Sequence, residues 1–209
     1  MGESREKCGM ELMYYGAYKH LRESAWQCLY DFGIDRLPVD VMKMARDSGI
    51  RIVRDSDAKI LNDGELGNSF YDGGTWIIVY DDSRSEAEIR YTVAHELGHI
   101  FLGHDTIHIR YRDLQGFDPK ARSEEQANSF AVRILCPACV IWGLKLVSAE
   151  EIADACHVEL RVAQKRAERM KILYKRNKFL TSHVEEKVYM RFANYIQDEL
   201  WRAENAKEN

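Results

Sequence analysis

Two histidines and a glutamate near the middle of the chain have the types and spacing of a metal site. His95 and His99 are four residues apart, and Glu96 directly follows the first of them, which gives the pattern H-E-x-x-H. Positions four apart lie on one face of a helix, so both imidazoles can bind one ion. Glu96 then lies to the side, where it can hold a water molecule instead of the ion. The pattern predicts metal-assisted hydrolysis; the alternative is a pair of surface histidines on an amphipathic helix.

A catalytic zinc ion also needs a third protein ligand and one open coordination position. The nearest candidates after the motif are His104, Asp105 and His108. His104 faces away from the first two histidines if the helix continues, because five residues correspond to about 500° of rotation. It could still approach them after the helix ends.

An acid further along the chain is the better candidate. Glu124 lies 25 residues beyond His99, which leaves room for a loop and a returning helix. Asn128 follows four residues later on the same face, so its amide can fix a histidine tautomer while Glu124 binds the ion. Glu125 is the main competitor, and the alternative interpretation of Glu124 is an acid that stabilises the start of a helix.

Two helices must position these side chains. The first is predicted to begin at a capping box formed by Ser83 and Glu86 and to run to about Gly103. The second is predicted over Ser123–Leu135 and ends before Pro137. Apolar residues on the first helix form a core-facing stripe opposite the histidines, namely Val93, Leu97, Ile100 and Phe101.

A small β region precedes the first of these helices. Ile50–Val53 alternates and is β-branched, which predicts a strand. The turn residues Asp72-Gly73-Gly74 separate Ser69–Tyr71 from Thr75–Tyr80, which predicts a hairpin. We expect the strand around Ile77–Tyr80 to hold a substrate as an added strand. Possible oxyanion-stabilising side chains are Tyr71, Tyr80, Tyr91 and His104.

The remainder of the chain is predicted to be helical. We expect an N-terminal helical segment over residues 1–36, a core over residues 37–143 and an accessory region over residues 144–209 that resembles a helix-turn-helix unit. The predicted fold class is α+β, a short sheet packed on the H-E-x-x-H helix with a helical C-terminal extension. Within the extension, residues 161–178 carry a net charge of +7. This stretch either docks a partner protein or DNA, or is a solvated basic helix that packs against the rest of the chain.

The composition indicates a globular protein. The 209 residues include 30 Lys and Arg against 34 Asp and Glu, so the surface as a whole does not attract nucleic acid. Apolar runs such as Trp76–Tyr80 are far below the ~20 residues of a membrane span. The absence of a signal peptide and the odd number of cysteines, five, predict a cytoplasmic protein with reduced thiols. Cys136 and Cys139 are interpreted as two packed thiols at a helix end.

The stretch from about Leu37 to Pro137 resembles the ImmA/IrrE family of zinc metallopeptidases. The resemblance rests on three segments, which are Leu37-Pro38-Val39-Asp40, Arg90–His99 and Glu124–Pro137. It implies a zincin-like core with one zinc ion per chain on His95, His99 and Glu124, and Glu96 as the general base. Mn²⁺ could replace zinc in vitro.

Members of this family typically relieve repression by cleaving a helix-turn-helix repressor, often one encoded on a phage or mobile element. We therefore expect a zinc-dependent endopeptidase with a protein substrate. One alternative is a non-catalytic, metal-stabilised regulator that binds a partner protein or DNA through its basic helical tail. A second alternative is a hydrolase of small peptides. Glu96 argues against the first, because a structural metal site has no use for an acid that is not a ligand.

Overall fold

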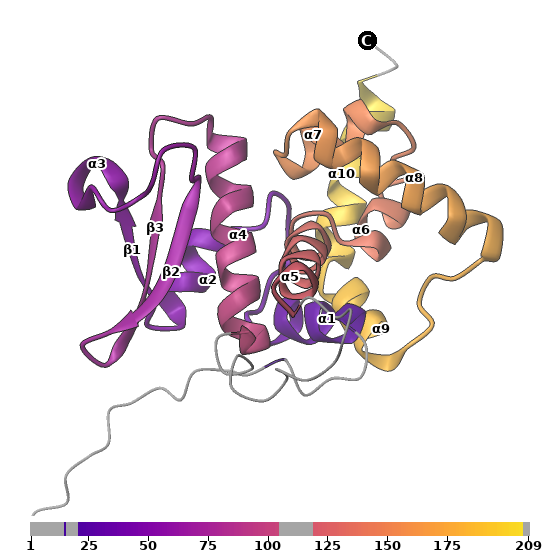
Figure 1. Ribbon diagram of the computed structural model, residues 1–209. Helices are drawn as coiled ribbons and strands as arrows, with labels where there is room; N and C mark the ends of the chain where they lie inside the picture. Colours follow the sequence, from indigo (N-terminus) through magenta and orange to yellow (C-terminus); the bar gives the residue numbers. More distant parts are fainter. Residues whose placement is uncertain (1–14, 16–20, 105–118, 207–209) are drawn as a thin grey trace, which may run out of the picture.

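The computed structural model describes residue 15, residues 21–104 and residues 119–206. Three strands and ten helices are found in this part of the chain (Figure 1). The strands are β1 Arg51–Arg54, β2 Gly67–Asp72 and β3 Thr75–Tyr80. The helices are α1 Leu21–Asp31, α2 Val41–Asp47, α3 Asp55–Ala58, α4 Glu86–Leu102, α5 Pro119–Leu135, α6 Ala138–Gly143, α7 Ala149–Cys156, α8 Leu160–Arg176, α9 His183–Arg191 and α10 Ala193–Asn205. The predicted α+β class, with a small sheet and a helical extension, is confirmed.

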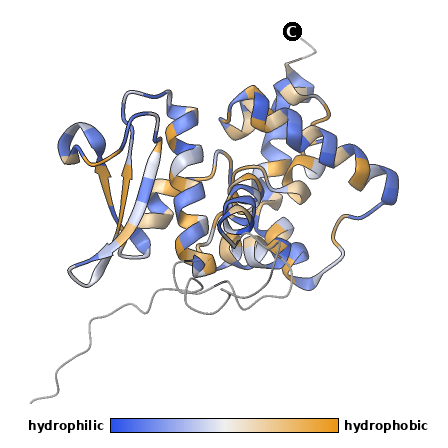
Figure 2. Cartoon of the chain, in the orientation of Figure 1, coloured by the Kyte–Doolittle hydropathy of each residue, from blue (hydrophilic) through white to orange (hydrophobic). Residues whose placement is uncertain are grey.

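The sheet is small and mixed, with the strand order β1-β3-β2. β3 is the most apolar strand, and it lies in the centre, where β1 pairs with it in parallel and β2 pairs with it antiparallel as the predicted hairpin. Figure 2 shows the contrast, since β3 is largely hydrophobic whereas β2 carries mostly pale and hydrophilic colours. The expectation that Ile77–Tyr80 holds a substrate strand is therefore wrong, because both edges of β3 are already paired. Of the described strands, β1 and β2 lie at the two edges of the sheet, and β2 is the one packed against α4.

Helix α4 carries the H-E-x-x-H pattern along one side of the sheet (Figure 1). Its capping box is formed by Ser85 and Glu88, not by the predicted Ser83 and Glu86. The reason is local: the Ser83 hydroxyl donates to Asp81 instead, at 2.6 Å, so it takes part in the turn before the helix. The predicted apolar stripe is fully buried, and Gly103 ends the helix in the left-handed conformation at a φ of 69°.

Helix α5 crosses α4 at very close range. A Cβ atom added at Gly98 of α4 would lie 3.1 Å from the Ala127 Cα and 3.2 Å from its carbonyl oxygen. Two small residues thus let the backbones approach, and this approach brings Glu124 next to the histidines of α4. Helix α5 begins at Pro119, earlier than the predicted Ser123.

The C-terminal helices share a core with the N-terminal part. Ile152, Val162 and Phe192 belong to one cluster of buried residues that also contains side chains of α1, α2 and α4. Arg90 of α4 is buried and donates to the carbonyl oxygens of Cys156 and His157 at the end of α7. The predicted division at residues 143/144 stays a prediction, but buried side chains on both sides of it are packed together.

Candidate metal centre

Three donor atoms from α4 and α5 converge on one point. Nε2 of His95 and Nε2 of His99 are 3.0 Å apart. One carboxylate oxygen of Glu124 is 3.3 Å from Nε2 of His95, and the other is 3.5 Å from Nε2 of His99. The ligand atoms of the three residues all lie within 4.8 Å of one another, so this group could hold a metal ion. No other such group of His, Cys, Asp or Glu is found among the residues that the structure describes.

The spacing of these atoms fits a tetrahedral ion such as zinc. Ligand bonds of about 2.0–2.1 Å in a tetrahedron place the donor atoms about 3.3 Å apart, close to the distances found here. Burial lowers the pKa of His95 and of His99, although Glu124 acts in the opposite direction. Both imidazoles are therefore neutral at neutral pH and can offer a lone pair. Their contacts with Glu124 are not ion pairs; they are the arrangement expected of ligands around a cation.

Asn128 lies behind His95, on the side away from the ligand atoms. Its Oδ1 is 3.1 Å from Nδ1 of His95 and accepts a hydrogen bond from the Tyr91 hydroxyl at 2.8 Å. Because an amide oxygen only accepts, Nδ1 of His95 carries the hydrogen and Nε2 presents its lone pair to the site. Tyr91 thus holds the amide in place, and its candidacy as an oxyanion-stabilising group stays a prediction. The spacing of Glu124 and Asn128 suggested the amide but could not suggest the tyrosine.

His104 lies beside His99, and its Nδ1 is 3.1 Å from Nδ1 of that residue. The left-handed Gly103 turns the chain out of the helix, so the rotation that would carry His104 away never occurs. His104 is not among the three grouped ligands. For His99 to offer its Nε2, its Nδ1 must carry a hydrogen, and Nδ1 of His104 then accepts it.

Glu96 lies next to the ligand atoms without joining them. Its buried carboxylate accepts a hydrogen bond of 2.6 Å from the hydroxyl of Ser69 on β2. A pocket of about 500 Å³, here called the metal pocket, is lined by both of these side chains and by the three grouped ligands. Gly67 lets β2 come this close, because a Cβ there would lie 2.3 Å from Cγ2 of Thr92. The sequence pattern predicted the position of Glu96 but gave no signal for Ser69.

The remaining candidates for the third ligand, and the oxyanion candidate Tyr71, are not found in the metal pocket of the described structure. Glu125 lines a neighbouring pocket and is not one of the grouped ligands. Asp105 and His108 lie outside the described residues. Tyr71 is largely exposed near the end of the hairpin, where its ring packs on Trp76, and it does not line the metal pocket.

A short mixed sheet, a helix with the H-E-x-x-H pattern and a second helix that supplies a carboxylate define a metallopeptidase-type protein. The chain belongs to peptidase family M78, since the family model described as IrrE N-terminal-like domain matches residues 45–168. The resemblance to ImmA/IrrE proteins is thereby confirmed. The match continues beyond residue 143 and includes α7 and the first half of α8.

A solved structure of a Mycobacterium tuberculosis transcriptional regulator has a similar fold, with a TM-score of 0.55 at 18% sequence identity. The similarity covers 72% of this chain but 47% of the regulator, so the chain spans about half of that protein's length. No curated protein matches the sequence. Among the described residues, no helix is both long and apolar enough to cross a membrane.

Proposed function

We propose that this protein is a zinc-dependent endopeptidase of the cytoplasm that cleaves a helix-turn-helix repressor of a phage or mobile element. The observation that carries the proposal is the position of Glu96, which borders the three ligand atoms and is not one of them. The membership of a peptidase family supports a protein substrate. The nature of the repressor rests on the family resemblance alone.

The residues of the site have distinct tasks in this reaction. His95, His99 and Glu124 would hold the zinc ion, with Asn128 and His104 fixing the two imidazoles. Zinc supplies Lewis acidity, which makes water nucleophilic at neutral pH and polarises a carbonyl group. The Glu96 carboxylate accepts the proton of the attacking water and passes it to the nitrogen of the leaving amine. Ser69 keeps that carboxylate oriented through its hydrogen bond.

The free edge of β2 can hold the substrate next to these residues. Gly67, Asn68 and Ser69 of this strand line the metal pocket, and the antiparallel partner of β2 occupies only one of its edges. An extended peptide can add to the other edge through main-chain hydrogen bonds, which would place a peptide carbonyl near Glu96. This arrangement favours a polypeptide substrate over a very small peptide.

The non-catalytic alternative assigns no role to Glu96. A structural metal site needs its ligands only, so the carboxylate of Glu96 would be dispensable. Replacing Glu96 by Gln keeps the shape of the side chain and removes the base. The protein is co-expressed with a candidate helix-turn-helix repressor from its own genome, and the repressor is examined for a cut, with zinc content measured in parallel.

We expect the parent protein to cut the repressor and Glu96→Gln to cut it at least ~10²-fold more slowly, with its zinc content unchanged. Cleavage by Glu96→Gln at the parental rate would contradict the mechanism. An intact repressor with the zinc-loaded parent protein would contradict the proposed substrate.

A further inference from the structure

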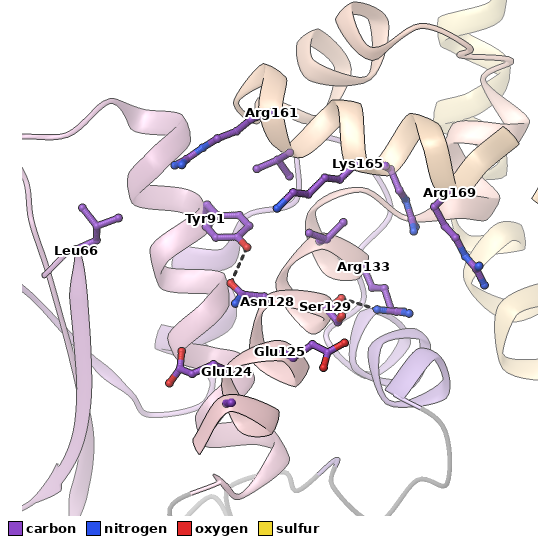
Figure 3. A pocket seen from close by; sticks show the side chains of 14 residues that line it. Leu66, Tyr91, Glu124, Glu125, Asn128, Ser129, Arg133, Arg161, Lys165 and Arg169 are labelled. Atoms are coloured by element: carbon purple, nitrogen blue, oxygen red, sulfur yellow. Dashed lines mark hydrogen bonds between the residues drawn. The ribbon is translucent and has the colours of Figure 1, made fainter. Parts of the chain in front are cut away.

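A second pocket of about 770 Å³ adjoins the metal pocket, between α4, α5 and α8 (Figure 3). We call it the basic pocket, because five of its lining residues are cations, namely Arg133, Arg161, Lys165, Arg166 and Arg169. Figure 3 shows Arg161, Lys165 and Arg169 extending from α8, with Arg133 on α5 below them. Among the described residues, two acids line it, Glu124 and Glu125, and both stand on α5 at the side of the metal centre.

Most of these cations form no ion pair with a described residue. Arg161 pairs with Glu159 at 2.7 Å. Within the described part of the chain, no carboxylate forms an ion pair with Arg133, Lys165, Arg166 or Arg169. Burial and like charges both disfavour the charged form of Arg133. Desolvation, and then repulsion by the neighbouring arginines, lower its pKa to about 10. An anion in this pocket would relieve the repulsion.

Two buried hydrogen-bond donors close to the basic pocket have no acceptor among the described residues. Arg166 is 6% exposed and its Nε has no partner, and the same holds for Nε1 of Trp26, which is 3% exposed. Both residues line a small cavity of about 40 Å³ that shares Arg133, Arg166 and Arg169 with the basic pocket and is also lined by the buried Glu185. A buried donor without an acceptor costs about 1–3 kcal/mol. Arg166 also lines the basic pocket, so an anion bound there can accept from it. Of these two spaces, Trp26 lines only the small cavity, which has room for about one water molecule.

The basic pocket is continuous with the path of a substrate. Glu124 lines both pockets. Leu66 lines the basic pocket, and the next residues of the chain, Gly67 to Ser69, line the metal pocket. A peptide lying along β2 therefore reaches the basic pocket at the end of the strand that Leu66 precedes.

We propose that the basic pocket binds an acidic side chain of the polypeptide substrate, a few residues from the bond that is cut. This inference rests on the proposed peptidase function and adds the charge of the segment that the enzyme selects. Nucleic acid fits less well. A helix reads DNA by entering the major groove with its contact face outward, whereas Arg161, Lys165 and Arg169 of α8 line a concave pocket.

Binding is tested separately from cleavage, in zinc-loaded Glu96→Gln protein. The probe is a fluorescent peptide rich in Glu, compared with its Gln analogue by anisotropy. The pocket variant is Lys165→Gln with Arg169→Gln. The matched control is Lys171→Gln with Lys175→Gln, which removes the same charge from exposed positions of the same helix outside the pocket.

We expect the Glu peptide to bind about 5- to 10-fold more weakly to the pocket variant, from two exposed charge contacts, and normally to the control. Equal losses in both variants, or equal binding of the Gln peptide, would overturn the proposal. So would tighter binding of a DNA oligonucleotide of the same charge through Lys165 and Arg169.

Cleavage of a proteome-derived peptide library by the zinc-loaded parent protein supplies the second measurement. We expect Asp and Glu to be enriched at a fixed distance from the cut bonds, and the enrichment to fall in the pocket variant alone. A preference unchanged by the pocket variant would overturn the proposal. If the library stays uncut while the Glu peptide still binds through Lys165 and Arg169, the peptidase function fails and the anion site remains.

Discussion

At the scale of single residues, the metal centre depends on side chains that orient other side chains. His95 is held through Asn128 and Tyr91, His99 contacts His104, and Glu96 is held by Ser69. Such supporting contacts commonly change metal affinity or activity by about 10- to 100-fold when removed. The chemistry of this site is therefore spread over more positions than the H-E-x-x-H pattern contains.

The third ligand gives a prediction with a built-in control. Glu124 and Glu125 are adjacent acids on α5, and only Glu124 reaches the two histidines. We expect Glu124→Ala to weaken zinc binding by about 100-fold or more, beyond the effect of losing a supporting contact, and Glu125→Ala to leave it nearly unchanged. Competition with a chromophoric chelator measures both. Equal zinc affinities in the two variants would show that Glu124 is not the third ligand.

The residue types at this site were largely predictable from the sequence, and their supports were not. A helix fixes the spacing of His95, Glu96 and His99, so their placement follows from local geometry. Ser69 reaches Glu96 because β2 packs on α4, and Tyr91 meets Asn128 because α5 crosses α4, so both contacts join distant segments of the chain. The placement of His104 depends on the left-handed turn at Gly103. With the helix ending there His104 lies beside His99, whereas a helix continued through it would point His104 away.

At the scale of elements, two glycines set the distances on which the site depends. Gly98 determines how close α5 comes to α4, and Gly67 determines how close β2 comes to the same helix. The predicted capping box was displaced by two residues, yet the helix and the hairpin were found, because the apolar pattern fixes the element and the cap fixes only its start. The substrate strand was misplaced because strand order is not a local property.

Substitutions at the two glycines should affect different properties of the protein. Gly98→Ala forces α4 and α5 apart, so we expect a loss of about 1–3 kcal/mol in the free energy of unfolding together with weaker zinc binding. Gly67→Ala moves β2 and Ser69 but leaves the three ligands in place, so zinc binding should persist while cleavage falls. Thermal unfolding and zinc titration of both proteins test this contrast. Undiminished zinc affinity in Gly98→Ala would show that the helix approach does not set the ligand geometry.

At the scale of the whole molecule, the helical extension is packed as part of the core. A Cβ added at Gly143 would lie 2.8 Å from Cδ1 of Ile196 and 2.9 Å from Cε2 of Tyr189, so α6 is in direct contact with the last helices. Cation–π contacts also connect Lys187 and Arg191 of α9 with Tyr30 of α1. Phe192 and Ile196, four residues apart near the C-terminus, are buried in this core.

Removing the chain after residue 147 tests this packing. The truncation takes away α7 to α10, exposes apolar partners in α1 and α6, and leaves the guanidinium of Arg90 without its carbonyl acceptors. We expect the fragment to aggregate or to lose its helical circular dichroism, and to bind no zinc. A folded fragment that binds zinc as the full chain does would instead make the extension a separable docking module.

Glu124 forms part of the wall of both pockets, and this shared wall has a thermodynamic consequence. A cation bound at Glu124 neutralises the charge that would repel an anion in the neighbouring space, so occupation of one pocket favours occupation of the other. Linkage makes the effect reciprocal, with one coupling factor for both ligands. An acidic substrate would then tighten the hold of the enzyme on its own metal. Titrating the Glu-rich peptide with and without zinc measures that factor.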